Sequence, residues 1–211
     1  ITQPDRPAGR GMEDNISPVK EKALEHELPI FQPEDINSEK SMDRIARLGP
    51  DAFLVAAYGQ IISQRILDLV RFPVNIHGSL LPDYRGAAPV NWAIINGEKE
   101  TGVTSMLMDS GMDTGPMLLQ RRVSVGPEQT AGELHDELAR IGGELLSPTL
   151  DGLELATLPP TPQPREGKEA PMLDREDGEL DWGNPSEAIH NKVRGMNPWP
   201  GAYTFFEDTK V

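Results

Sequence analysis

Short apolar runs alternate with segments of helical periodicity along this chain, and that alternation restricts the possible folds more than any other feature. Residues 51–59 (DAFLVAAYG) are apolar almost throughout, which is typical of a strand buried on both faces of its sheet. We expect further strands at residues 28–33, 72–78, 101–109 and 117–125, and helices at residues 17–27, 38–48, 63–70, 88–97, from 130 past 145, and 185–195. This order predicts an α/β fold with a largely parallel sheet flanked by helices.

The ends of several helices are marked by residues that satisfy the free backbone groups of a terminal turn. Ser17, followed by a proline, predicts one helix start. Thr130 and Glu133 have capping-box spacing at the start of a long helix with an apolar stripe. The proline-rich residues 159–171 predict an irregular surface connection. Two prolines and a glycine within residues 196–203 end the last helix, and we place a domain boundary near there.

The composition narrows the class of protein. The chain of 211 residues has no cysteine, which excludes a disulfide framework and a thiolate metal site. No apolar run approaches the roughly 18 residues needed to cross a bilayer, so we expect a cytoplasmic protein. The formal net charge of −14 argues against general affinity for nucleic acid, because phosphate contacts need lysine and arginine. Both ends read as interrupted strands, and we expect the fold to be truncated there.

Asn75 and His77 place two polar side chains in a strand that is otherwise apolar. Residues two apart on a strand point to the same face, so both are expected at its carboxyl end, where open α/β sheets bind ligands. An amide N–H and an imidazole nitrogen that converge there can hold an oxyanion. The alternative is that both side chains only satisfy backbone groups at the end of the strand.

Asp113 lies between two glycines in a loop that follows another predicted strand. Taken alone it is typical of a turn aspartate. If the loop folds back over the sheet end, its carboxylate can accept from the His77 ring and fix the tautomer. The remaining histidines have no metal-ligand spacing, so we predict no metal. Ser79 lacks the context of a nucleophilic serine, and the chain has neither a dinucleotide fingerprint nor a P-loop.

Four stretches together resemble the 10-formyltetrahydrofolate-dependent formyltransferases. They are NIHGSLLPDYRGAAP at residues 75–89, ETGVT at 100–104, MDSGMDTG at 108–115 and NPWPGAY at 197–203. The opening loop TQPDRPAGRG at residues 2–11, with the SPVK that follows, narrows the resemblance to the members whose acceptor is methionyl-tRNA. The similarity extends from Thr2 to about Tyr203, and the order and spacing of the stretches carry it.

The resemblance implies which residues act. The family's catalytic asparagine, histidine and aspartate match Asn75, His77 and Asp113. Its folate-contacting loop matches the residues Ser79, Leu80, Leu81 and Pro82. Two leucines suit a flat ring because they offer it apolar surface, while backbone groups can bind its edge. The alternative is that both leucines belong to the core.

The tRNA-contacting loop of the family matches residues 5–11, with Arg6 and, principally, Arg10 as contacts. Only Asp5 is an acidic neighbour, so a local positive loop can meet phosphate on an acidic body. The resemblance also implies a Rossmann-like core at residues 1–190, without its first strand and helix. Residues 191–211 are expected to be a linker and the start of a barrel-like tRNA-binding domain. The expected partners are initiator methionyl-tRNA and folate, without a membrane, and we expect a monomer.

The implied reaction, for translation initiation, moves a formyl group from 10-formyltetrahydrofolate to the α-amino group of methionyl-tRNA. The amine attacks directly, Asn75 and His77 stabilise the oxyanion, and either His77 or a water held by Asp113 relays the proton. Three alternatives stay open. They are a formyltransferase that acts on an amino sugar nucleotide, a non-catalytic folate-binding or tRNA-binding module, and a hydrolase with water as acceptor.

Overall fold

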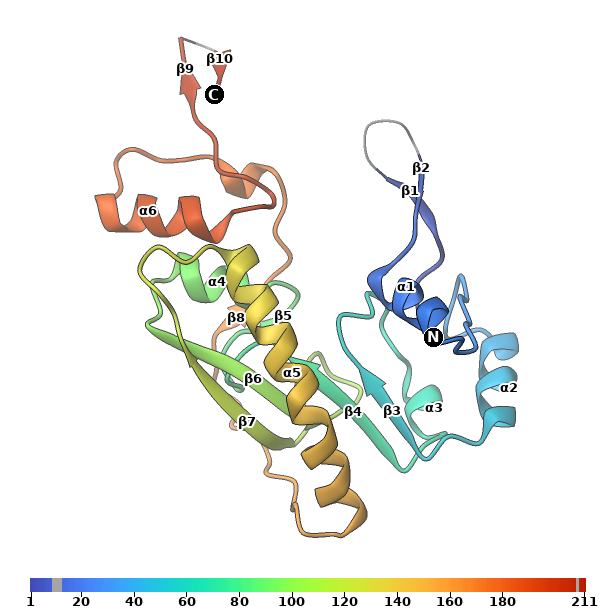
Figure 1. The fold of residues 1–211 in the computed structure, drawn as a ribbon. Helices are drawn as coiled ribbons and strands as arrows, with labels where there is room; N and C mark the ends of the chain where they lie inside the picture. Colours follow the sequence, from blue (N-terminus) through green and yellow to red (C-terminus); the bar gives the residue numbers. More distant parts are fainter. Residues whose placement is uncertain (9–12, 208) are drawn as a thin grey trace.

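A four-stranded sheet forms the centre of the molecule, as a computed structural model shows (Figure 1). The structure describes residues 1–8, 13–207 and 209–211, without the side chains of residues 6–8 and 13–15. The strands lie in the order β3-β4-β6-β7, with bounds β3 Ala52–Val55, β4 Phe72–His77, β6 Glu100–Leu107 and β7 Met117–Ser124. Helices flank this sheet, and the predicted α/β class is confirmed.

The pairing within the sheet is mixed among the described strands, where the sequence indicated a largely parallel sheet. β3 and β4 are parallel, since the chain crosses back through the short helix α3 (Gln64–Leu67) between them. β6 returns antiparallel to β4 after helix α4 (Pro89–Ile95). β6 and β7 are antiparallel, because one loop, residues 108–116, joins them as a hairpin.

The long helix α5 (Ala131–Glu154) covers one face of the sheet. Its predicted capping box is present, with Thr130 N donating to Glu133 Oε2 at 2.8 Å and Glu133 N to Thr130 Oγ1 at 3.3 Å. The main hydrophobic cluster joins this helix to α4, β6 and β7, and includes Leu134, Leu138, Ile141, Leu145, Val90, Ile94, Val103 and Val123. Burial of each such side chain contributes about 1.5–3 kcal/mol to stability. This packing therefore holds α5 against the face of the sheet that it covers.

The first part of the chain forms a separate arm beside β3. A short antiparallel pair, β1 (Arg6–Ala8) and β2 (Glu13–Asn15), precedes helix α1 (Pro18–Glu25), which Ser17 caps as predicted. Helix α2 (Glu39–Leu48) follows, and Ile45 packs there with Ile36 and Ile66.

Two expectations for this arm were wrong. Residues 28–33 are irregular, because two prolines in that segment remove backbone donors that a strand needs. β3 is buried on one face only. Phe53 packs into the cluster of Ile45 and Ile66, whereas Leu54, which points the opposite way, is 48% exposed.

The last part of the chain forms the other arm, around α4. Helix α6 (Ser186–Gly195) packs on α4, where Asn91 Nδ2 donates to Gly195 O at 2.8 Å. The connection after α5 is mostly irregular, as predicted, and its only described strand is β8 (Glu169–Ala170), which pairs in parallel with β5 (Arg85–Gly86). The 3-10 turn η1 (Glu176–Gly178) precedes α6, and the antiparallel strands β9 (Phe205–Phe206) and β10 (Thr209–Lys210) follow it.

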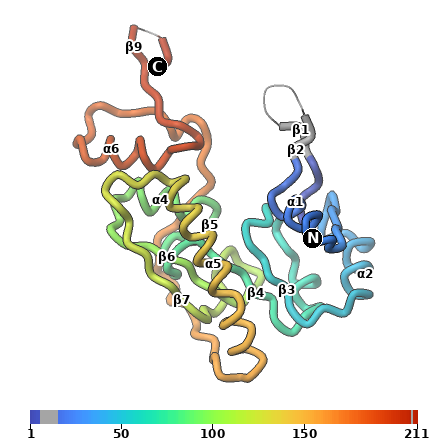
Figure 2. Tube along the Cα trace, in the orientation of Figure 1, coloured from blue at the N-terminus to red at the C-terminus, as the bar shows by residue number. Residues whose placement is uncertain are grey.

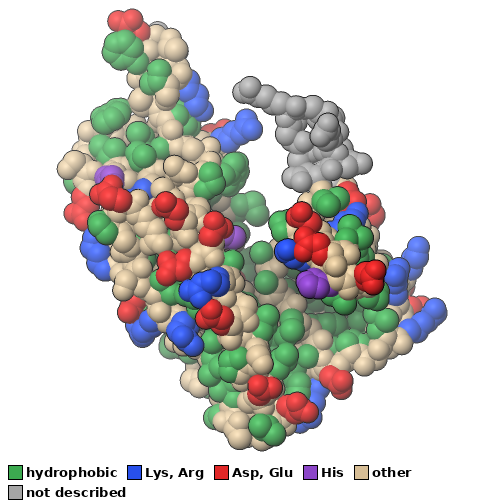
Figure 3. All heavy atoms as spheres, in the orientation of Figure 1, with side chains coloured by type: hydrophobic (Ala, Val, Ile, Leu, Met, Phe, Trp, Pro, Cys, Tyr) green, Lys and Arg blue, Asp and Glu red, His purple; other side chains and the backbone are tan. Residues whose placement is uncertain are grey.

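The two arms stand apart on either side of β4, and the two chain ends lie on different arms (Figure 2). The space-filling view shows a hollow between them whose floor is largely hydrophobic (Figure 3). Within the described residues, no helix has the length and apolar character to cross a membrane.

Candidate active site

Strand β4 carries Asn75 and His77 at its carboxyl end. Its register places Asn75 opposite Met106 and His77 opposite Thr104 of β6. His77 is buried and Asn75 is half-buried. Both side chains contact the same carboxylate, as described next, so the expectation that they share one face of the strand is confirmed.

Asp113 reaches this strand from the loop between β6 and β7. Its Oδ1 accepts from Asn75 Nδ2 at 3.4 Å, and its Oδ2 lies 3.6 Å from His77 Nδ1. Gly86 N also donates to Oδ2, at 3.0 Å. The loop therefore folds back over the sheet end, and the structure brings together all three side chains that the sequence singled out.

The backbone of Asp113 has a left-handed conformation, with φ of 54°. This region is uncommon for residues other than glycine, although aspartate enters it more readily than most. Surrounding contacts must hold such a conformation, because it costs about 1–3 kcal/mol. The position of the carboxylate thus depends on what fixes its loop.

The ring of His77 is held from its other side by a backbone carbonyl. His77 Nε2 lies 2.8 Å from Tyr84 O. A carbonyl oxygen only accepts, so Nε2 carries a proton and donates it. Nδ1 faces Asp113. Because Nε2 is already hydrogen-bonded, Nδ1 is the nitrogen at which the ring can gain or lose a proton.

Tyr84 is itself held in an uncommon backbone conformation, with φ of 62°. Its side chain is buried, and its hydroxyl donates to Glu98 Oε1 at 2.6 Å. Burial raises the pKa of the Tyr84 hydroxyl, and the hydrogen bond to Glu98 raises it further. Burial alone would raise the pKa of Glu98, but hydrogen bonds from Lys168 and Tyr84 outweigh it and leave that pKa below its ordinary value.

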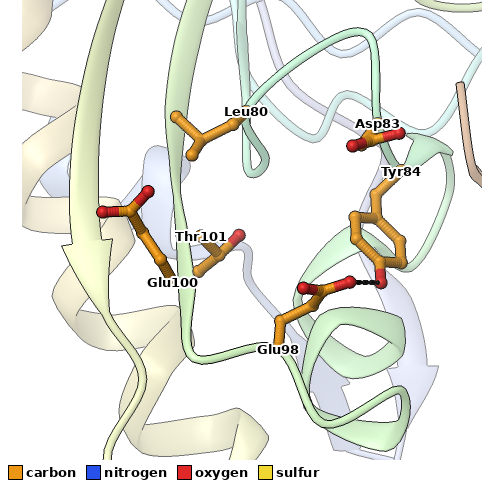
Figure 4. Close-up of a pocket in the computed structure, with 6 residues that line it drawn as sticks. All are labelled: Leu80, Asp83, Tyr84, Glu98, Glu100 and Thr101. Carbon is orange, nitrogen blue, oxygen red and sulfur yellow. Dashed lines mark hydrogen bonds between the residues drawn. The ribbon is translucent and has the colours of Figure 1, made fainter.

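A small pocket lies beside this tyrosine (Figure 4). Its lining residues are Leu80, Asp83, Tyr84, Glu98, Glu100 and Thr101. In the close-up, Leu80 and Thr101 face Asp83 and Tyr84 across it. The lining includes neither Asn75, His77 nor Asp113, so this pocket is distinct from the cluster that those residues form.

The loop expected to contact folate packs largely against the protein. Ser79 is fully buried, and its hydroxyl donates to Asp83 O at 2.6 Å. Leu81 is buried, its N–H donates to Thr104 Oγ1 at 3.1 Å, and its carbonyl accepts from Gln120 Nε2 at 2.8 Å. Leu80 and Pro82 are only half-buried. Leu81 is thus a core residue, and its two neighbours present the surface of this loop.

The two arginines expected to contact tRNA are not placed by the structure. Arg10 lies outside the described residues, and Arg6 belongs to β1, where the side chains are not described. Among the described residues, no three histidine, cysteine, aspartate or glutamate side chains are grouped as a metal ion would need.

Three residues at the site were missed by sequence reasoning. Gly86 and Tyr84 lie in the motif that carried the resemblance. A glycine is a sequence signal for a positive φ, here 121°, whereas a tyrosine gives no signal for the φ of 62° found at position 84. Gln163 donates to the carbonyls of Asp113 and Gly115 from the proline-rich connection. No local pattern marks it, because its contacts are about fifty residues away in the chain.

Comparison with known proteins fits this arrangement. The family model described as formyl transferase matches residues 1–150, and the model for the formyl transferase C-terminal domain matches residues 172–211. The chain therefore belongs to the formyl transferase family.

The curated relatives identify a particular member of this family. The methionyl-tRNA formyltransferases of Acetivibrio thermocellus and Ruminiclostridium cellulolyticum are 48% and 49% identical to the chain over 213 residues. In both cases the alignment covers 100% of this chain and 68% of the relative. The chain thus spans about two thirds of the length of these enzymes.

Solved structures share the fold at lower identity. A sugar N-formyltransferase from a Shewanella species has a TM-score of 0.74 at 23% identity, covering 90% of this chain and 77% of its own. HypX from Aquifex aeolicus, in complex with tetrahydrofolic acid, has a TM-score of 0.67 at 23% identity, covering 79% of this chain and 29% of its own. These matches confirm the Rossmann-like formyltransferase core.

Proposed function

We propose that this chain catalyses formyl transfer from 10-formyltetrahydrofolate to the α-amino group of initiator methionyl-tRNA. The observation that carries the proposal is the contact of Asp113 with both Asn75 and His77, in a chain about half identical to methionyl-tRNA formyltransferases. A binding module has no need of an amide and an imidazole that converge on one carboxylate. The reaction supplies a substrate for translation initiation, which places it in the cytoplasm.

Asn75 is assigned the role of stabilising the oxyanion. Its amide carries two N–H groups, and the contact with Asp113 uses one of them. The other can donate to the formyl oxygen when the amine attacks and negative charge collects there. Asp113 orients the amide, so the carboxylate contributes to oxyanion binding without touching the oxygen.

His77 and Asp113 are assigned the role of proton transfer. The attacking amine must lose a proton, and the folate nitrogen must gain one before its bond to the formyl carbon breaks. Since Nε2 is committed to the Tyr84 carbonyl, the exchange takes place at Nδ1, directly or through a water on Asp113. A protonated ring beside the carboxylate also adds positive charge near the developing oxyanion.

The substrates are assigned to two further surfaces. Leu80 and Pro82, which are half-buried, supply the apolar face for folate. Arg6 and Arg10 are assigned to tRNA binding, and the rest of the attraction comes from a C-terminal domain that begins after residue 190. The catalytic core is assigned to residues 1–190, and the protein is assigned as a monomer.

A transfer assay tests the proposal. Purified full-length protein is given 10-formyltetrahydrofolate with charged initiator tRNA, an amino sugar nucleotide, or water alone as acceptor, and formylated product is measured. Formylation of methionyl-tRNA alone is expected. Preference for the sugar, or release of formate without an acceptor, contradicts the assignment.

Variants test the residues. Asn75→Ala is expected to lower kcat by about 10²–10³, and His77→Ala by a similar factor, while folate binding, followed by calorimetry, is retained. His190→Ala is the matched control, because that histidine is exposed and pairs with Glu128 away from the cluster. Wild-type kcat in either site variant argues against the mechanism.

A further inference from the structure

The connection between the two regions matched by the family models contacts the loop that carries Asp113. Gln163 lies in this connection, and its Nε2 donates to Asp113 O at 2.8 Å and to Gly115 O at 2.7 Å. The backbone beside it is also docked, since Met117 N donates to Thr161 O and Thr161 N to Met117 O, both at 2.8 Å. The connection is therefore fixed against the start of β7 rather than spanning free space.

Arg85 determines which way the Gln163 amide points. Arg85 Nε and Nη2 donate to Gln163 Oε1 at 2.9 and 2.8 Å. The same guanidinium donates to the carbonyls of Pro164 and Arg165. Because Oε1 faces only donors and Nε2 only acceptors, the amide has one consistent orientation.

Arg85 and Gly86 are adjacent on β5, and each reaches the Asp113 loop by a separate path. Gly86 N donates to the carboxylate of Asp113 at 3.0 Å, whereas Arg85 acts on its backbone through Gln163. Asp113 is thus held both at its side-chain carboxylate and at its backbone carbonyl. This suits a left-handed aspartate, whose conformation neighbouring contacts must maintain.

We propose that Gln163 is a positioning residue for formyl transfer, which holds the loop of residues 113–115 so that the Asp113 carboxylate stays against Asn75 and His77. The inference rests on the proposed function of Asp113. Without the amide donor, the loop relaxes from its left-handed conformation and the carboxylate moves away from both partners. The substrates still bind, since the described side-chain hydrogen bonds of Gln163 go to the loop and to Arg85.

Two substitutions separate this role from simple anchoring of the connection. Gln163→Ala removes the donor and the contact with Arg85. Gln163→Glu keeps an acceptor for Arg85 but places a carboxylate oxygen against two carbonyl oxygens. Both are expected to lower kcat about 10- to 100-fold in full-length protein, with the KM for methionyl-tRNA and for the folate donor within about twofold. If Gln163 only anchors the connection, Gln163→Glu keeps wild-type kcat, and the proposal is overturned.

A double-mutant comparison tests whether Gln163 acts through Asp113. The variant Asp113→Ala with Gln163→Ala is expected to be no slower than Asp113→Ala alone. If the two losses multiply, Gln163 acts by another route and the proposal is wrong. Normal kcat in Asp113→Ala rejects the proposed catalytic cluster itself, whereas normal kcat in Gln163→Ala beside an impaired Asp113→Ala rejects only the positioning role.

Glu166→Gln is the matched control within the same connection, because Glu166 is exposed there. It is expected to retain wild-type kcat. Urea unfolding of each variant checks that loss of kcat is not loss of fold, and a kcat loss that follows the loss of unfolding free energy across all the variants counts against positioning.

Discussion

Two adjacent glycines in helix α5 should respond in opposite ways to the same substitution. A Cβ added at Gly142 would lie 2.9 Å from Ile76 Cγ2 and 3.7 Å from Val103 Cγ1. A Cβ added at Gly143 would meet nothing within 4 Å. Gly142 faces the sheet and Gly143 faces solvent, so the pair separates helix propensity from packing.

The expected magnitudes follow from these contacts. Alanine in a helix interior is about 0.8–1.0 kcal/mol more favourable than glycine, and Gly143→Ala should gain that amount. Gly142→Ala gains the same propensity but overpacks against Ile76, a β-branched side chain on a strand, at a cost of about 1–3 kcal/mol. The free energy of unfolding should therefore differ between the two variants by about 1–3 kcal/mol.

Urea unfolding of both variants measures this difference. Because Ile76 lies between Asn75 and His77 on β4, Gly142→Ala should also lower kcat for formyl transfer, whereas Gly143→Ala should not. Equal stabilisation by the two substitutions would refute the reasoning, since it would mean that α5 moves off β4 without cost.

Three further predictions concern other parts of the site and its supports. Gly86→Ala should lower both stability and kcat, because its Cβ would lie 2.5 Å from Ala170 O at a φ of 121°, which costs at least about 1–3 kcal/mol; urea unfolding and a transfer assay measure both. Thr130→Ala should cost about 0.5–2 kcal/mol of stability without changing kcat, since it removes only a helix cap. The pKa of Glu98 is lower in the folded protein than its ordinary value of 4.5. The ionised carboxylate therefore stabilises the fold above pH 4.5, and this contribution is lost as the pH falls through the lower folded pKa. Glu98→Gln should therefore be less stable than wild type at about pH 7, and the gap should narrow as the pH falls below 4.5 in urea titrations.

Features that depend on neighbouring residues could be predicted from the sequence. The caps at Ser17 and Thr130 are contacts across three residues, and the common face of Asn75 and His77 follows from the two-residue period of a strand. The approach of Asp113 could be predicted only on the condition that its loop folds back, since a turn aspartate has the same local pattern.

Features that depend on distant partners could not be predicted. The apolar run at β3 indicated burial on both faces, but Leu54 is exposed because burial depends on what packs against each face. The contact of Arg85 with Gln163 joins residues 78 apart in the chain. A proline-rich segment typical of a surface connection gives no sign that one of its side chains reaches the loop of Asp113.

The pairing of β5 with β8 has a consequence for the order in which the enzyme is completed during synthesis. β5 belongs to the motif that carries the resemblance, but its partner follows the long helix α5. A ribosome adding about 5–20 residues per second therefore exposes Asn75, His77 and Asp113 several seconds before the segment that braces them. A nascent chain stopped at Glu154 is expected to contain all three of these side chains and still be inactive in formyl transfer.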